Sequence, residues 1–534
     1  MVWPSMHNFE YILLLLILVI SLAPAARRLD IPLPIMLVIG GMLMYALPMK
    51  TPDFDPELIF LIFVPPLLYI AALTSSARDL KRYQQAISRL AIGCVIATIA
   101  AVAVVAHYCA GLPWAVSIVL GAMVSPPDAA VTLAISRRLG LPRPVVTILE
   151  GETLFNDLVA FITYRMAIAA VVVGTFSWWE AVPHLIYSAG GGVLIGLATA
   201  VVIIFLRSFI REPRVANTLS LLTPFAAYLP AEWIHASGVL AVVTTGLYLG
   251  RVAPRIVRAQ TRLQGQQMWD VLTYVLNGLI FVLIGTQLGK IIGTFILHWN
   301  THLFLCVLAI SSCVIVVRIL WVFPAAYMPT LLFRRYHVDS QGDHPPWRHV
   351  AVVAWTGIRG GDTLVTALAL PLTIQSGAAF PGREMVQTLA YGVILATLVL
   401  QGLSLRPLIR SFRFPVDQSE NLEETEARRR VAEAGANRLT DMAKLEKMPD
   451  DVVKQIRIHH HLRRHVRSGG ESQMENEGSS ILGRHLLRIN RDVLRAEREM
   501  LIGLRDHSVI ADDVMRRLMR ELDLEEVVME REID

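Results

Sequence analysis

Apolar runs of about 20 residues recur along the first 410 positions of this 534-residue chain. A helix of that length crosses the hydrocarbon core of a lipid bilayer. Only 17% of the residues are charged, whereas soluble domains carry about a quarter. The pattern excludes an ordinary soluble enzyme and a disordered protein, and it predicts an all-α polytopic membrane protein.

The apolar runs predict thirteen transmembrane helices, and the basic residues between them indicate their direction. Nineteen Lys and Arg residues lie in the odd-numbered loops and three in the even-numbered loops. Because positive charge is retained on the cytoplasmic side, we expect the N-terminus outside and the C-terminus in the cytoplasm. The expected location is the cell (inner) membrane. The expected spans are residues 10–25, 31–48, 56–73, 88–110, 114–136, 144–173, 183–206, 216–234, 237–250, 268–289, 297–324, 348–372 and 385–410.

Charge divides the chain into two parts. Residues 1–410, the predicted transmembrane domain, carry 27 Lys and Arg against 18 Asp and Glu, and residues 411–534 carry 22 against 26. The basic residues of the first part lie in short loops, which argues against nucleic acid as a partner. The second part has no long apolar run and is typical of a cytosolic helical tail.

Helical segments are expected in the tail at 419–447, 450–467, 480–506 and 510–532, and the third has an apolar face. Histidines at 459–465 alternate with arginines, so we expect a basic surface there and not a metal site. Two interpretations of the tail stay open. It is either a module that regulates the membrane domain, dimerises or binds a cytosolic regulator, or a solvated extension without a specific role.

Two predicted spans contain helix breakers at mid-depth. Pro126 and Pro127 precede Asp128 in the fifth span, and the glycines of 357–361 flank Arg359 in the twelfth. Irregular backbone at membrane depth is tolerated only where protein or a water-filled cavity covers it. Because the two breaks lie seven spans apart, spans 1–6 and 8–13 are predicted to be two inverted six-helix repeats. Such repeats with discontinuous helices are typical of secondary transporters.

The sixth span carries buried acids, of which Glu152 and Asp157 are the most informative. A charge at the bilayer centre costs at least a few kcal/mol, so each acid needs a partner or a function. Arg359 is the expected partner of Glu152 or Asp128, and we interpret that pairing of Glu152 as structural.

Asp157 has a different expected role. It lies near the middle of the span, with Asn156, Thr153 and the unwound 125–128 backbone as neighbours. Carboxylate, amide, hydroxyl and carbonyl oxygens suit a hard monovalent cation. We therefore predict that Asp157 has a functional role.

At these residues the sequence resembles the bacterial Na+/H+ antiporters of the monovalent cation:proton antiporter-1 family, over nearly all of 1–410. A Gly-Glu-x-Leu-x-Asn-Asp pattern in a thirteen-helix frame is specific to it. The segments that carry the resemblance are PPLLY at 65–69, VSPPDAAV at 124–131, LEGETLFND at 149–157, GVLAVVTTGLYLG at 238–250, LNGLIFVLIG at 276–285 and GIRGG at 357–361.

The resemblance implies a role for each matching residue. Asp157 binds either the cation or the proton, and Asn156 marks the electroneutral branch of the family. Asp128 and Thr153 complete the site, so that Asp157 and Asp128 are the expected Na+ ligands.

The resemblance further implies that Glu152 and Arg359 form a buried ion pair between helices 6 and 12. It also implies a homodimer with a role in pH homeostasis, and an elevator-like shift of one helix bundle.

Three positions depart from the family pattern. Pro127 stands where many members have Thr, and the run at 69–72 lacks the acid that many members place in helix 3. Asp362 is an added acid after the GIRGG segment, and we expect it to balance Arg359 more than to supply a ligand.

The expected function is electroneutral exchange of Na+, and also Li+, for H+, because cation and proton compete for Asp157. A K+/H+ antiporter of the same fold stays open, since oxygen ligands alone do not fix ion size. A membrane channel is a further and weaker alternative. An enzyme is not expected, because the chain has no H-E-x-x-H motif and no span offers a nucleophile with a base. Besides the transported ions and the lipid bilayer, no cofactor is expected.

Overall fold

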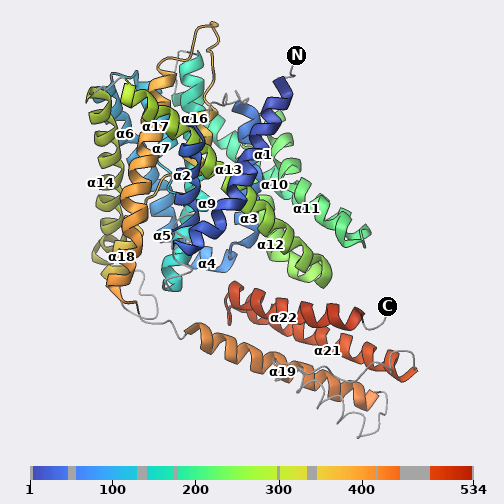
Figure 1. Ribbon diagram of the computed structural model, residues 1–534. Helices are drawn as coiled ribbons and strands as arrows, with labels where there is room; N and C mark the ends of the chain where they lie inside the picture. The colour runs from blue at the N-terminus through green and yellow to red at the C-terminus, as the bar shows by residue number, and fades with distance from the viewer. Residues whose placement is uncertain are drawn as a thin grey trace.

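The computed structural model describes residues 4–29, 31–45, 56–128, 141–173, 178–297, 301–332, 345–414, 419–445 and 481–531. Within these ranges the regular structure is helical (Figure 1), apart from an isolated bridge between Thr373 and Ala379. Eight helical stretches are long and apolar enough to cross a membrane, and 33–45, 58–74 and 114–124 are shorter apolar helices. The all-helical membrane class is therefore confirmed, whereas the number of thirteen spans and their repeat stay predictions.

Helices overlap all thirteen of the expected ranges. In the membrane part they are α1 (Pro4–Arg28), α2 (Leu33–Tyr45), α3 (Pro56–Thr74), α4 (Ala77–Arg82), α5 (Gln84–Ser88), α6 (Val95–Ala110), α7 (Trp114–Val124), α9 (Arg143–Val173), α10 (Trp178–Phe209), α11 (Pro213–Trp233), α12 (Gly238–Ile256), α13 (Ala259–Leu297), α14 (Thr301–Leu332), α15 (Trp347–Trp355), α16 (Gly361–Leu368), α17 (Arg383–Thr397) and α18 (Leu403–Phe412). Two π-helical turns, η1 (Arg89–Cys94) and η2 (Leu398–Gly402), lie before α6 and after α17.

The membrane helices pack as two bundles (Figure 1). In the first bundle α2 packs on α13 and α1, and α12 packs on α3, α10 and α11. In the second bundle α6 packs on α7 and α14, α7 on α9, and α14 on α15 and α17. The short helix α16 contacts α7 and α17 of the second bundle and α3 and α13 of the first. Helix α16 therefore lies at the junction between the two bundles.

Glycine permits a close contact between α2 and α13 in the first bundle. A Cβ at Gly41 of α2 would lie 2.2 Å from the carbonyl oxygen of Val282, and a Cβ at Gly285 of α13 would lie 2.1 Å from that of Val38. Small residues that allow two backbones to touch are typical of membrane helix pairs.

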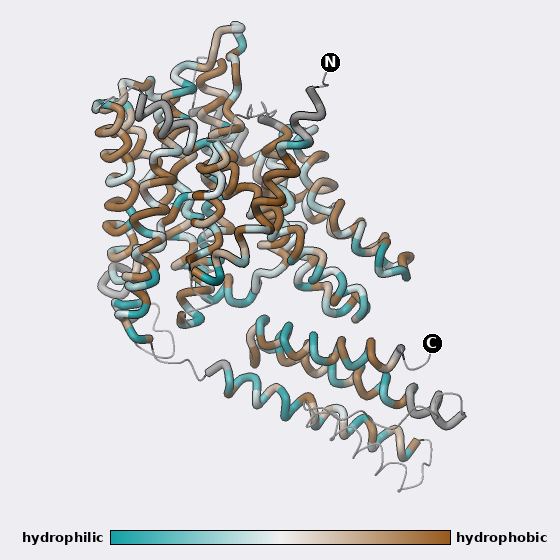
Figure 2. Tube along the Cα trace, viewed as in Figure 1, coloured by the Kyte–Doolittle hydropathy of each residue, from teal (hydrophilic) through white to brown (hydrophobic). Residues whose placement is uncertain are grey.

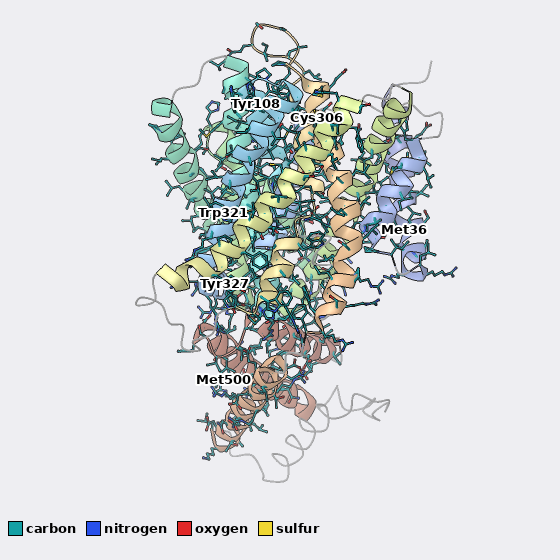
Figure 3. All side chains as sticks on the ribbon, turned by 90° about the vertical axis from the view of Figure 1, so that its left-hand side faces the viewer. Met36, Tyr108, Cys306, Trp321, Tyr327 and Met500 are labelled. Carbon is teal, nitrogen blue, oxygen red and sulfur yellow. The ribbon has the colours of Figure 1, made fainter. Side chains whose placement is uncertain are left out.

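The outer surface of the bundles fits a lipid environment. Large apolar side chains such as Ile20, Leu43, Phe209 and Leu320 are exposed on it, and the hydropathy colouring shows apolar residues along the whole height of the bundles (Figure 2). Tyr108 lies near one end of the molecule and Tyr327 towards the end that faces the tail (Figure 3). Soluble proteins rarely expose apolar area on this scale.

The tail forms a small helical unit of its own beneath the bundles (Figure 1). Its helices are α19 (Ser419–Leu445), α21 (Ile481–Asp506) and α22 (Asp512–Arg531). Apolar side chains from all three helices form its core, among them Val431, Leu501 and Met515. The three expected tail helices near 419–447, 480–506 and 510–532 are thus present. The expected segment 450–467 and the histidines of 459–465 lie outside the described residues.

Acidic groups of the tail meet basic groups at one end of both bundles. Arg262 of α13 pairs with the buried Asp523, which also accepts a hydrogen bond from Arg498 at 3.0 Å. Arg143 at the start of α9 pairs with Asp513 at 2.8 Å and with Glu423 at 3.4 Å. The tail therefore contacts the first bundle through α13 and the second through α9.

Candidate functional site

Helix α9 brings four of the predicted residues into the interior. Glu152, Asn156 and Asp157 are 1%, 0% and 3% exposed. Thr153 is half-buried, and its hydroxyl donates to the carbonyl oxygen of Leu149 at 2.9 Å, one turn earlier. Helix α9 is continuous through these four residues. The two predicted helix breaks lie in other helices.

The break in the fifth span lies where the prolines predict it. Helix α7 ends at Val124, and residues 125–128 are not helical. The two prolines offer no amide hydrogen to continue the helix. The second half of this span, residues 129–136, lies outside the described part, so only its first half is observed.

The break in the twelfth span lies at the glycines. Helix α15 ends at Trp355 and α16 begins at Gly361, with the unwound residues 356–360 between them. A Cβ at Gly360 would lie 2.2 Å from Oδ2 of Asp128. Glycine is therefore needed at 360 because the Asp128 carboxylate occupies that space.

The two breaks are connected by two hydrogen bonds. The amide N–H of Asp128 donates to the carbonyl oxygen of Ile358 at 2.8 Å, and the amide N–H of Gly361 donates to Oδ2 of Asp128 at 2.9 Å. Asp128 thus satisfies a free amide group at the start of α16 and lies at its positive end. Polar groups of the unwound backbone in one break are thus hydrogen-bonded to the other break, as burial at membrane depth requires.

The predicted ion pair between Glu152 and Arg359 is wrong. Arg359 donates its Nε to the carbonyl oxygen of Val124 at 2.6 Å and its Nη1 to that of Gly357. The backbone N–H of Arg359 donates to the hydroxyl oxygen of Thr397 at 3.0 Å. Arg359 therefore satisfies the carbonyl groups that both breaks leave open, and it forms no ion pair with Glu152.

The partner of Glu152 is Arg318 of α14. Its Nη1 and Nη2 donate to the two carboxylate oxygens of Glu152 at 2.5 and 3.0 Å, and Nη2 also donates to the carbonyl oxygen of Val353. Both side chains are 1% exposed. Arg318 is absent from the residues predicted above, although a single arginine in the apolar run SSCVIVVRILWVF indicates a buried partner.

Asp157 has polar neighbours but little hydrogen bonding. Its Oδ1 and both side-chain atoms of Asn156 are buried without a hydrogen-bond partner in the described part of the chain. The same holds for the hydroxyl of Thr363 on α16. Buried polar atoms are nearly always paired, so this set of open oxygen and nitrogen atoms favours a site for a ligand.

The charges around Asp157 are acidic. The carboxyl groups of Asp362, Asp128 and Glu152 lie close enough to Asp157 to interact with its charge. The carboxylate of Glu152 is neutralised by Arg318. The predicted residues Asp157, Asp128 and Glu152 are thus near enough to influence one another, and Asp362 joins them.

Comparison with known proteins decides the family. A family model described as "Sodium/hydrogen exchanger, transmembrane" matches residues 14–411. This chain belongs to the sodium/hydrogen exchanger family. The resemblance that its motifs carry is therefore confirmed, and the family consists of cation/proton antiporters in membranes.

Two relatives illustrate the range of the family. This exchanger is 33% identical to an uncharacterized Na(+)/H(+) exchanger of Mycobacterium tuberculosis over 502 residues, 92% of this chain and 91% of that protein. It is 32% identical to a "Sodium, potassium, lithium and rubidium/H(+) antiporter" of Bacillus pumilus over 418 residues, 76% of this chain and 61% of that one.

A solved structure shares the fold. The sodium proton antiporter MjNhaP1 of Methanocaldococcus jannaschii matches this exchanger with a TM-score of 0.58 at 20% identity, over 76% of this chain and 99% of that one. The match supports the polytopic antiporter fold of the membrane part.

Proposed function

We propose that this exchanger transports Na+, and also Li+, in exchange for H+, with one cation exchanged for one proton at Asp157. The observation that carries the proposal is the buried Oδ1 of Asp157, which has no hydrogen-bond partner in the described residues. A carboxylate in such surroundings favours a neutral state, and either a proton or a monovalent cation provides it.

Asp128, Asn156 and Thr153 are the further groups of the proposed site. Asp128 lies at the crossing of the two breaks, and Asn156 has a free amide beside Asp157. Thr153 uses its hydroxyl hydrogen towards Leu149, which leaves oxygen lone pairs for a cation. Na+ is bound in this scheme by Asp157 and Asp128, with no cofactor.

Exchange follows from competition at one group. The charge of the Asp157 carboxylate is compensated by Na+ or by H+, and it is uncompensated when the site is empty. A charged site crosses the membrane interior poorly, so the loaded forms cross and the empty form does not. The gradient that is steeper then drives the other ion, without ATP.

The two bundles support an elevator-like movement as the transport step. The second bundle carries α7, α9 and α15, while α16 contacts both bundles beside the site. We propose that the second bundle moves against the first, within a homodimer whose N-terminus is outside and whose tail is cytoplasmic. The acidic tail groups that pair with loop arginines support this orientation, and a role in pH homeostasis follows from Na+/H+ exchange.

K+/H+ exchange is the second candidate. The Bacillus pumilus relative is named for four alkali cations, and oxygen ligands alone do not select one ion size. The test is proton flux in proteoliposomes driven by equal gradients of Na+, Li+ or K+, with the membrane potential clamped. Flux with Na+ and Li+ that is insensitive to the potential is the expected result. Flux with K+ alone, or a strong dependence on potential, contradicts the proposal.

A further inference from the structure

Asp362 is an acid whose role the ion-pair prediction does not explain. It lies in the first turn of α16, half-buried, two residues after Gly360. Its expected task, balancing Arg359, is not observed, because Arg359 is bound to the carbonyl oxygens of Val124 and Gly357. In the described residues the Asp362 carboxylate forms no ion pair and no hydrogen bond to another side chain.

Stabilising the helix is not a sufficient role for Asp362. An acid in the first turn of a helix is favourable because of the helix dipole. The Asp128 carboxylate, however, already accepts the Gly361 N–H at this end of α16. A second carboxylate there adds like-charge repulsion, and the charge of Asp128 does act on Asp362. The arrangement becomes favourable when a positive charge lies among these acids.

Open polar atoms on the opposite helix point to such a charge. Asp157 Oδ1 and the amide of Asn156 on α9 are buried without partners, and so is the hydroxyl of Thr363, next to Asp362. Asp362 is also close enough to Asp157 for the two charges to interact. An acid on α9 and an acid on α16 thus lie near buried polar atoms that lack hydrogen-bond partners.

We infer that Asp362 is a further carboxylate ligand of the transported monovalent cation, in addition to Asp157 and Asp128, and that it sets the affinity and selectivity of the site. The inference rests on the proposed exchange at Asp157. In this scheme Asp362 compensates for the acid that the 69–72 segment of α3 lacks, because α16 packs against α3.

The test compares three variants in proteoliposomes. Asp362→Asn removes the charge at nearly constant size, and Asp362→Glu keeps the charge but moves the oxygens by one methylene group. Glu384→Gln is the matched control, because Glu384 is also an acid in the first turn of a helix, α17, but is exposed. The apparent KM for Na+, Li+ and K+ and the maximal rate are measured for each.

Asp362→Asn is expected to raise the KM for Na+ by about tenfold or more, the effect of losing one charged ligand contact, and to lower the maximal rate less. Asp362→Glu is expected to keep a KM near that of the wild type while the ratio of the Li+ and Na+ values changes. Glu384→Gln is expected to change neither.

An unchanged KM and an unchanged cation preference in Asp362→Asn would overturn the inference. A lower melting temperature with both values unchanged would show that Asp362 has a structural role only. If Asp362→Asn does not fold, the selectivity of Asp362→Glu decides: an unchanged Li+/Na+ ratio overturns the inference. Failure of the proposed function is distinguishable, because the wild type would then exchange no Na+ for H+.

Discussion

Arg318 of α14 donates both terminal guanidinium nitrogens to the two carboxylate oxygens of Glu152 on α9, and neither side chain reaches solvent or lipid. The pair connects two helices of the second bundle, and the contact from Arg318 to the carbonyl oxygen of Val353 adds α15. Burying two charges is costly. Removing one partner therefore destabilises the protein strongly, whereas replacing both partners with apolar residues costs little.

Arg318→Met is therefore expected to destabilise the protein by about 3–5 kcal/mol, because it leaves the Glu152 charge buried without a partner. The measurement is the melting temperature or denaturant midpoint in detergent. The double variant Glu152→Gln with Arg318→Met is expected to recover most of the loss. Arg165→Met is the control, since Arg165 and its partner Glu232 are 43% and 27% exposed. A loss in the control as large as that in Arg318→Met would refute the account of the pair.

Gly360→Ala tests the crossing of the two broken helices. The added Cβ would lie 2.2 Å from the Asp128 carboxylate oxygen that accepts the Gly361 N–H. We expect loss of nearly all exchange activity with the protein still in the membrane. Gly190→Ala is the matched control, because a Cβ at Gly190 of α10 meets no atom within 4 Å. Equal activity of both variants would show that Asp128 does not need its observed position.

Asp79 of α4 makes the contact between tail and membrane domain sensitive to pH. Burial raises the pKa of Asp79, Ser76 and Arg78 lower it, and the charges of Asp512 and Asp513 on the tail raise it further. A raised carboxyl pKa means that tail docking is most favourable below the ordinary value of about 3.9 and weakens as pH rises through the raised value.

Asp79→Asn is thus expected to strengthen docking at neutral pH and to have a smaller effect near pH 4, close to the ordinary pKa of the carboxyl group. Hydrogen exchange of α22, corrected for the intrinsic effect of pH, measures the docking. The same difference between variant and wild type at both pH values would contradict the assignment to Asp79.

The sequence predicted the features that depend on local chemistry. Runs of apolar residues predict helices because the backbone must satisfy itself in lipid, and the breaks follow from Pro126, Pro127 and the glycines of 357–361. The burial of Glu152, Asn156 and Asp157 also follows from their position in an apolar run.

The partners of buried charges could not be predicted in the same way. Arg318 and Arg359 both lie in apolar runs, and which of them meets Glu152 depends on how the helices of the second bundle pack together. Arg359 donates to backbone carbonyl oxygens that the two breaks leave without helical partners. This arrangement exists only where the two breaks lie side by side in the fold. The docking of the tail through Asp523 and Asp513 is likewise a long-range contact that hydropathy does not reveal.

The most direct test of the account is Na+-driven proton movement in proteoliposomes that contain Asp157→Asn. The exposed Asp270 of α13 provides the control Asp270→Asn, the same substitution away from the site. Both variants are first shown to be folded by their melting temperatures. The account predicts that Asp157→Asn exchanges no faster than empty liposomes while Asp270→Asn exchanges like the wild type. Exchange by Asp157→Asn at the wild-type rate would contradict it.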